Sequence, residues 1–152
     1  MAKNDRYYIK DILQGLEERF SDVCEAQENE SGEQISTVYT NGRPSATDNH
    51  TEFLVISLSR SVYSHGPYQN AAIYIDIYAR NGQGGIERTY RLQELLDAVT
   101  NKFPITTEDE RWKATRPKLV IRGDDSLGFS AWRVRARLFV NTTDRYSTIS
   151  DT

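Results

Sequence analysis

The chain has 152 residues, of which 38% are apolar and 27% charged, with a formal net charge of −3. This length fits one domain with one core, and no apolar run reaches the roughly 20 residues that span a bilayer. A single cysteine, Cys24, excludes a disulfide framework and a multi-cysteine zinc site. The acidic balance does not favour a nucleic-acid binder. No secretory signal follows Met1, so we expect a soluble intracellular protein without membrane contact.

An amphipathic helix is predicted at the start of the chain, over residues 5–21. Its apolar residues recur at three- and four-residue spacing, which is the helical period. They are Tyr8, Ile9, Ile12, Leu13, Leu16 and Phe20.

The segment that follows, residues 25–50, is polar and lacks a clear period. The pair Asn41-Gly42 marks a turn within it, because these residues adopt positive φ at low cost. We expect a long polar loop or a hairpin arm here, with at most a short strand over residues 35–40.

Two strands and a second helix are predicted over the middle of the chain. Residues 53–59 form a continuous apolar run, which is typical of a central strand. Residues 71–79 alternate between apolar and polar side chains, which is the strand period. A helix follows over residues 86–103 and ends at Pro104.

The last predicted elements are strands over residues 118–122 and 129–140, joined by a turn and followed by a polar tail, 141–152, which we expect to be frayed. The order is therefore α-(β)-β-β-α-β-β over a single domain, residues 1–140. This order favours an α+β fold with a single, mostly antiparallel sheet of four to five strands and two helices packed on one face.

No residue pattern indicates catalysis, a cofactor or a bound metal. The glycine-rich loop at 82–85 matches neither the dinucleotide fingerprint nor the P-loop. The acidic loop 108–110 and the turn 124–125 lack the spacing of a calcium loop, so solvated turns explain them better. Both histidines fall in predicted loops, and Cys24 has no activating motif. We therefore expect a protein that is not an enzyme.

An arginine stripe on the last predicted strand is the most unusual local feature. Arg133, Arg135 and Arg137 occupy alternate positions, so they share one face at a spacing of roughly 6–7 Å. Asp76 lies within a predicted strand and can form an ion pair with an arginine on a neighbouring strand. If the last two strands pair as a hairpin, Arg122 extends the stripe. We favour ion pairing or a protein interface over contact with nucleic acid, because the chain is acidic overall.

The sheet face that the helices leave uncovered would also show Tyr74 and Tyr78, on either side of Asp76. Tyrosine and arginine are both enriched at protein interfaces, since each buries a large surface and keeps a polar tip. The composition of this face therefore favours burial against a partner over plain exposure to solvent.

The order of the elements resembles that of the tail-terminator (tail-completion) proteins of long-tailed bacteriophages. The likeness covers residues 5–140: an amphipathic helix, an apolar strand after a polar segment, an alternating strand, a helix and a closing hairpin. The closest local likeness is the hairpin at 122–132, with its Asp-rich turn, Gly-aromatic step and start of the final strand.

The resemblance implies a structural, head-tail joining protein of a phage or prophage virion. Such proteins assemble in the cytoplasm of the bacterial host as a homo-oligomeric ring of six copies. In the virion, the ring caps the head-proximal end of the tail tube, contacts the tube protein and the head connector protein, and lets DNA pass through. A ring needs two different, complementary patches on each subunit. The residues that we expect in them are Arg133, Arg135, Arg137, Tyr74, Asp76, Tyr78, Glu108, Asp109 and Glu110.

Two other functions stay open from the sequence. The first is a nucleic-acid-binding module that uses Arg133, Arg135 and Arg137, and it requires salt-dependent binding. The second is a metal-dependent hydrolase or nuclease built on Asp76 and the turn at 124–125. The sequence also does not separate a terminator from a neighbouring neck protein.

Overall fold

The computed structural model describes residues 2–40, 42–59, 63–65 and 68–141. Its elements, in chain order, are α1 (Ala2–Phe20), β1 (Gln27–Glu28), β2 (Gln34–Ile35), β3 (Val38–Thr40), β4 (Glu52–Leu58), β5 (Tyr63–His65), β6 (Tyr68–Arg80), a 3-10 turn η1 (Gln83–Gly85), α2 (Thr89–Asn101), β7 (Ile105–Thr106), β8 (Trp112–Ala114), β9 (Lys118–Asp124) and β10 (Phe129–Asn141).

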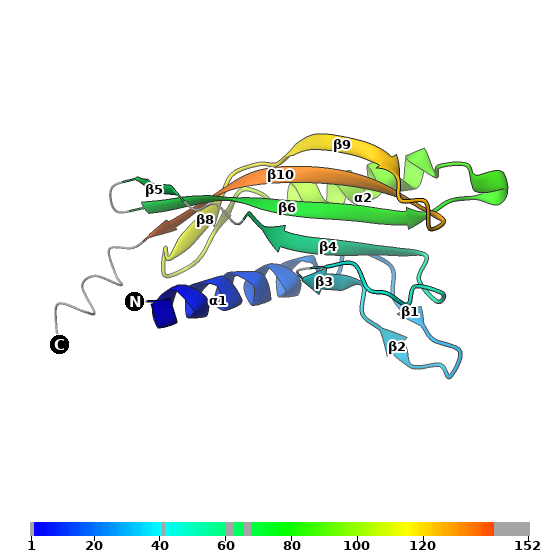
Figure 1. Ribbon diagram of the computed structural model, residues 1–152, viewed down its shortest axis with the longest axis horizontal. Coiled ribbons are helices and arrows are strands. Elements are labelled where there is room, and N and C mark those ends of the chain that lie inside the picture. Colours follow the sequence, from blue (N-terminus) through cyan, green and yellow to red (C-terminus); the bar gives the residue numbers. More distant parts are fainter. Residues whose placement is uncertain (1, 41, 60–62, 66–67, 142–152) are drawn as a thin grey trace.

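The centre of the fold is the antiparallel pair of long strands β6 and β10, which runs through the middle of Figure 1. One continuous path of strands has the order β3-β4-β6-β10-β8-β7, and two more strands join it, β5 beside β6 and β9 beside β10. The pair β3–β4 is parallel, and the other pairs of this sheet are antiparallel. Strands β1 and β2 form a separate two-stranded sheet.

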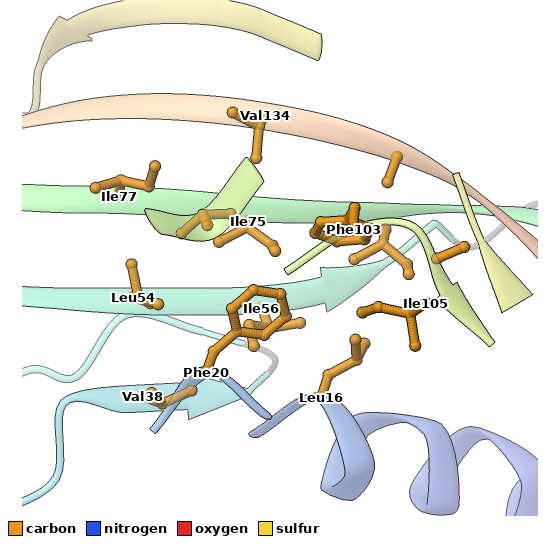
Figure 2. Packing of buried hydrophobic residues seen from close by; sticks show 14 of the residues in the cluster. Leu16, Phe20, Val38, Leu54, Ile56, Ile75, Ile77, Phe103, Ile105 and Val134 are labelled. Atoms are coloured by element: carbon orange, nitrogen blue, oxygen red, sulfur yellow. The ribbon is translucent and has the colours of Figure 1, made fainter. Parts of the chain in front are cut away.

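The main core lies between the two helices and one face of this sheet. Ile75 of β6 is paired with Ile56 of β4 on one side and with Val134 of β10 on the other, and all three side chains are buried. Leu16 of α1 and Leu95 of α2 belong to the same buried cluster. Figure 2 shows side chains of α1 and of the sheet meeting in this layer. Each buried aliphatic side chain of this kind contributes about 1.5–3 kcal/mol.

The predicted α+β class and its two helices are confirmed, but the predicted sheet is wrong. The sheet is larger than four to five strands, it is mixed because β3 runs parallel to β4, and a second small sheet exists. Strand β3 lies within the short strand expected over residues 35–40, and the additional strands β5, β7 and β8 each have only two or three residues. Strands this short leave no detectable alternation in the sequence, since their pairing depends on distant neighbours.

The polar segment 25–50 contains a hairpin, a sheet strand and a covering segment. Asn29 closes the β1–β2 turn, because its side-chain Oδ1 accepts hydrogen bonds from the backbone N–H groups of Ser31 and Glu33, both at 2.9 Å. Strand β3 then joins the main sheet beside β4. Residues 42–50, here called the strap, lie against the sheet face that is opposite to the helices. Of the predicted tail 141–152, all but Asn141 lie outside the described residues.

The second helix begins later than predicted, at Thr89 in place of residue 86. The backbone of Ile86 is extended, at φ −81° and ψ 132°, and Arg88 is also outside the helical region, so the first turn of the predicted helix does not form. Gly84 and Gly85, which precede it, both have a left-handed φ of 75°. They form the 3-10 turn η1 instead. Neither described helix is long and apolar enough to cross a membrane.

Candidate interaction surface

The arginine stripe lies on the face of β10 that points away from the helices. The alternate residues Val134, Ala136 and Leu138 are buried against the helices, so Arg133, Arg135 and Arg137 project from the opposite side. We call this side the open face.

Arg133 is held by its neighbours on β6. It lies opposite Asp76 in the strand register, and its Nε and Nη2 donate to the two carboxylate oxygens at 2.6 and 3.0 Å. Its guanidinium also lies 4.9 Å from the centre of the Tyr74 ring. The hydrogen bonds to Asp76 raise the pKa of Arg133, against an opposing effect of burial. The predicted cross-strand ion pair of Asp76 is confirmed, and Arg133 is thereby neutralised within the chain.

Arg135 and Arg137 differ from Arg133, because both are exposed and no carboxylate in the described part of the chain forms an ion pair with either. They line a hollow of about 450 Å³ on the open face, together with Tyr74 and the start of β6. Asn70 also lines it, and the buried Oδ1 of Asn70 accepts no hydrogen bond from any described residue. The hollow thus presents two positive groups to any molecule that covers it.

Two lysines enlarge the positive surface. Lys118 of β9 is paired directly opposite Arg135, and the ammonium of Lys113 on β8 lies 5.7 Å from the centre of the Phe139 ring, which Arg137 also contacts. Like charges in directly opposite strand positions are destabilising in an isolated sheet. We call Lys113, Lys118, Arg135 and Arg137 the basic patch. The two lysines were missed from the sequence, because only the strand register brings them beside the stripe.

Arg122 does not extend the stripe, so this prediction is wrong. The strands β9 and β10 do pair, but Arg122 lies opposite Trp132, whose side chain is on the helix-covered face. The guanidinium of Arg122 lies 4.4 Å from the centre of the Trp132 ring and 3.3 Å from a carboxylate oxygen of Glu87. A bulge at Val120, which the register skips, separates the part of β9 that holds Arg122 from the part that holds Lys118.

Tyr78 lies on the same side of the sheet as the stripe but beneath the strap. Its ring stacks on Phe53 at 4.6 Å, and Phe129 completes the cluster. Arg43 of the strap lies over all three rings at 5.3–5.6 Å and pairs with Asp125. The strap therefore covers one end of the open face, and the basic patch remains at the other end.

The predicted acidic loop is the turn between β7 and β8, and Glu108, Asp109 and Glu110 are all exposed there. Arg111 connects this turn to α1, because its guanidinium lies 3.7 Å from Asp109 and 3.6 Å from Asp11. Burial raises the pKa of Asp109, but hydrogen bonds from Thr107 and from the backbone N–H of Arg111 outweigh it and lower the pKa. This turn, here called the acidic turn, lies beside α1, on the opposite side of the sheet from the basic patch.

The other acidic residues of interest stabilise the chain locally. Asp125 accepts hydrogen bonds from the backbone N–H groups of Leu127 and Phe129, and Asp124 accepts one from Ser126. These are the contacts of a turn. Within the described ranges, no three His, Cys, Asp or Glu residues gather as a metal site.

Cys24 is buried beside a buried ion pair that the sequence did not indicate. Glu52, which is 2% exposed, accepts two hydrogen bonds from Arg91 of α2 at 2.7 and 2.8 Å and a third from the backbone N–H of Glu25. Burial, with the charge of Glu52 beside it, raises the pKa of the Cys24 thiol to about 12. The thiol is therefore protonated at neutral pH, and the pair joins α2 to β4.

No protein-family model matches the chain, and no curated protein matches it significantly.

Proposed function

We propose that this protein is a structural, non-enzymatic tail terminator of a bacteriophage or prophage, which assembles as a homo-oligomeric ring. The observation that carries the proposal is the pair of oppositely charged surfaces on one chain. The basic patch is on the open face of the sheet, and the acidic turn lies beside α1, behind the sheet. The assignment to a phage tail rests on the resemblance of the element order to that of tail-terminator proteins.

The positions of the two surfaces favour assembly in rings over assembly in dimers. One chain cannot join its own basic patch to its own acidic turn, because the sheet separates them. A contact between the patch of one copy and the turn of the next is heterologous, and repeated heterologous contacts give a ring when the rotation between copies closes, whereas a dimer needs a self-complementary patch. The ring would cap the tail tube, contact the head connector and let DNA pass, first in the host cytoplasm and then in the virion.

The test is mass photometry over a concentration series, with negative-stain images of the largest species. We expect wild-type rings, and we expect Arg135→Glu combined with Arg137→Glu to weaken assembly by at least about tenfold, since like charges then face the acidic turn. Arg88→Glu is the matched control, because Arg88 is exposed on the N-terminal side of α2 and away from the basic patch.

Mixing complementary variants sharpens this test. The double variant Glu108→Arg with Glu110→Arg should form no rings by itself. Rings should return when it is mixed with the double variant Arg135→Glu with Arg137→Glu, because the charges are again opposite at the contact. Rings that persist unchanged in both double variants would contradict the proposed contact. A wild type that stays monomeric at every concentration, and also fails to bind the end of a tail tube, would contradict the function.

A second function has one observation in its favour, namely the absence of a neutralising carboxylate at Arg135 and Arg137 among the described ion pairs. Such a patch can contact phosphates of DNA or RNA. The net charge of −3 opposes this reading. Titration with labelled DNA at low salt separates the two functions, because binding through the patch must weaken steeply as salt is added and must be lost when both arginines become serine.

A further inference from the structure

Strand β9 is an exposed, apolar edge of the sheet. All seven of its residues are exposed, and three are large and apolar, namely Leu119, Val120 and Ile121. Within the described residues, its only strand partner is β10, so the opposite edge of β9 is free. A free apolar edge favours association with another chain, unless something covers it.

A groove runs along α1 at the opposite edge of the sheet. It encloses about 890 Å³ and reaches from the middle of α1 to Thr40, the last residue of β3. Ile9 and Leu13 supply apolar surface to it, and Ile9 is 47% exposed. The groove is lined by Ile9, Lys10, Leu13, Gln14, Glu17, Glu18, Ser21 and Thr40.

The charges of the two features are complementary. Glu17 and Glu18 outnumber Lys10 in the groove, which leaves one net negative charge among its lining residues. Lys118 begins β9, and Arg116 precedes it by two residues; both are exposed. Charge complementarity of this kind fixes the orientation in which two surfaces meet.

The two features cannot meet within one chain. The strand order places β3 at one end of the sheet and β9 beside β10 on the other side of β6. Figure 1 shows α1 and β3 below β4, and β9 on the far side of β10. Strand β9 of the same chain therefore cannot occupy the groove, and two unlike features at opposite edges of the sheet suit the repeated contact of a ring.

We propose that β9 of one copy lies in the α1 groove of the next copy. The side chain of Ile121, which shares the open face with Lys118 because of the bulge at Val120, would cover Ile9, and Lys118 would lie near Glu17 and Glu18. This contact rests on the proposed assembly into rings and names a second place where neighbouring subunits touch, in addition to the basic patch and the acidic turn.

The test is disulfide formation between single-cysteine variants. Ile121→Cys and Gln14→Cys each add an exposed thiol, one to β9 and one to the groove. The natural Cys24 does not compete, because it is buried and its pKa is raised to about 12. Gln93→Cys is the matched control, since Gln93 is an exposed glutamine on α2.

Each possible arrangement gives a different product under mild oxidation. We expect a covalent dimer from a mixture of the Ile121→Cys and Gln14→Cys variants, and none when Gln93→Cys replaces the groove variant. A doubly substituted chain should give a ladder of multimers that stops at the ring. Efficient dimers from Ile121→Cys alone would overturn the proposal, because they show β9 facing β9 in a two-fold dimer.

The outcomes also separate this contact from the proposed function. Rings in mass photometry without mixed disulfides overturn the docking of β9 and leave the ring proposal intact. The absence of both rings and mixed disulfides contradicts both.

Charge reversal gives an independent measurement. Glu17→Lys combined with Glu18→Lys should raise the concentration at which rings form by about tenfold, because two lysines then face Lys118. Adding Arg116→Glu to the same chain should recover part of the loss, because Arg116 is exposed just before β9 and is not part of the basic patch. If the double variant Glu17→Lys with Glu18→Lys forms normal rings at the same concentration as wild type, the proposal is overturned.

Discussion

The two faces of the main sheet are covered in different ways, although the same strands supply both. On one face, α1 and α2 bury a continuous aliphatic layer, which includes Ile75 and Val134. On the other face, the strap covers only an aromatic cluster around Phe53, and the basic patch stays exposed. Strand alternation assigns side chains to faces, but what lies over each face decides whether it becomes core or surface.

Each face also holds one bidentate arginine–carboxylate pair, and their surroundings differ. Glu52 and Arg91 meet beneath α2, where the side chain of Glu52 is 3% exposed. Asp76 and Arg133 meet on the open face, where their side chains are 14% and 40% exposed, against 3% for Glu52 and 20% for Arg91. Water screens the Asp76–Arg133 pair more than the Glu52–Arg91 pair. We therefore expect the loss of Glu52 to lower the free energy of unfolding more than the loss of Asp76.

The largest effect is expected from Glu52→Ala, which leaves Arg91 partly buried with only the exposed Glu94, at 3.8 Å, as a counter-charge. Loss of one member of a buried pair costs about 3–5 kcal/mol, so we expect the free energy of unfolding to fall by about 3 kcal/mol. Urea titration followed by the fluorescence of the buried Trp112 and Trp132 measures it. The double variant Glu52→Leu with Arg91→Met should recover part of the loss. If Glu52→Ala lowers the free energy of unfolding by less than about 1 kcal/mol, the Glu52–Arg91 pair is no better shielded from water than an exposed pair.

Removal of the strap contact should have the second-largest effect. Arg43→Ala deletes the guanidinium that lies over three rings and pairs with Asp125. We expect a loss of about 2 kcal/mol, since the cation–π contacts are shielded from water. Arg88→Ala, at an exposed position, is the control and should change stability by less than about 0.5 kcal/mol. Equal losses in the two variants would mean that the strap does not cover the aromatic cluster.

The strap should also make stability depend on pH through His50. This side chain is 5% exposed and its Nε2 lies 2.7 Å from the hydroxyl of Tyr39. Burial lowers the pKa of His50 from the ordinary 6.5, with Arg80 and Arg43 acting in the same direction and a hydrogen bond with Ser36 opposing them.

Because the folded pKa of His50 is depressed, its contribution is fully present above pH 6.5 and is lost as pH falls from 6.5 toward the folded pKa. The slope due to one proton is at most about 1.4 kcal/mol per pH unit. Denaturant titrations at several pH values should show a shallower decline in His50→Gln than in wild type below pH 6.5. Parallel pH profiles would exclude His50 as the titrating group.

The smallest effect is expected from Asp76→Asn on the open face. Exposed ion pairs contribute about 0.2–1 kcal/mol, so we expect a loss under about 1 kcal/mol by urea titration. High salt should reduce the difference from wild type further. A loss as large as that of Glu52→Ala would show that the open face is as well shielded as the helix-covered face.

The fold could be predicted from the sequence wherever an element carries its own period. The stripe of Ile12, Leu16 and Phe20 predicted α1, and the alternation about Ile75 predicted β6. Of the six strands of two or three residues, β5, β7 and β8 were missed for the opposite reason, since each is defined by its pairing with a neighbouring strand rather than by its own residues.

The candidate surface was predictable in part. The arginine stripe followed from alternation, and Asp76 was expected to pair with an arginine on a neighbouring strand, but the strand register decides that this arginine is Arg133. The structure adds Lys118 to the stripe and removes Arg122 from it. A single bulge at Val120 is the reason, because residues on its two sides point to opposite faces of the sheet. A shift of one residue in a strand reverses every side chain beyond it, and no local pattern records where the shift occurs.

The sequence by itself determined which residues are apolar at helical or strand spacing, and therefore the long elements and the shared face of Arg133, Arg135 and Arg137. Only the tertiary structure decided that the strap covers Tyr78, that Glu52 meets Arg91, and that acidic and basic surfaces lie on opposite sides of the sheet. Period is a property of neighbouring residues, whereas these contacts join residues far apart in the chain, whose meeting depends on how the whole sheet is paired and packed.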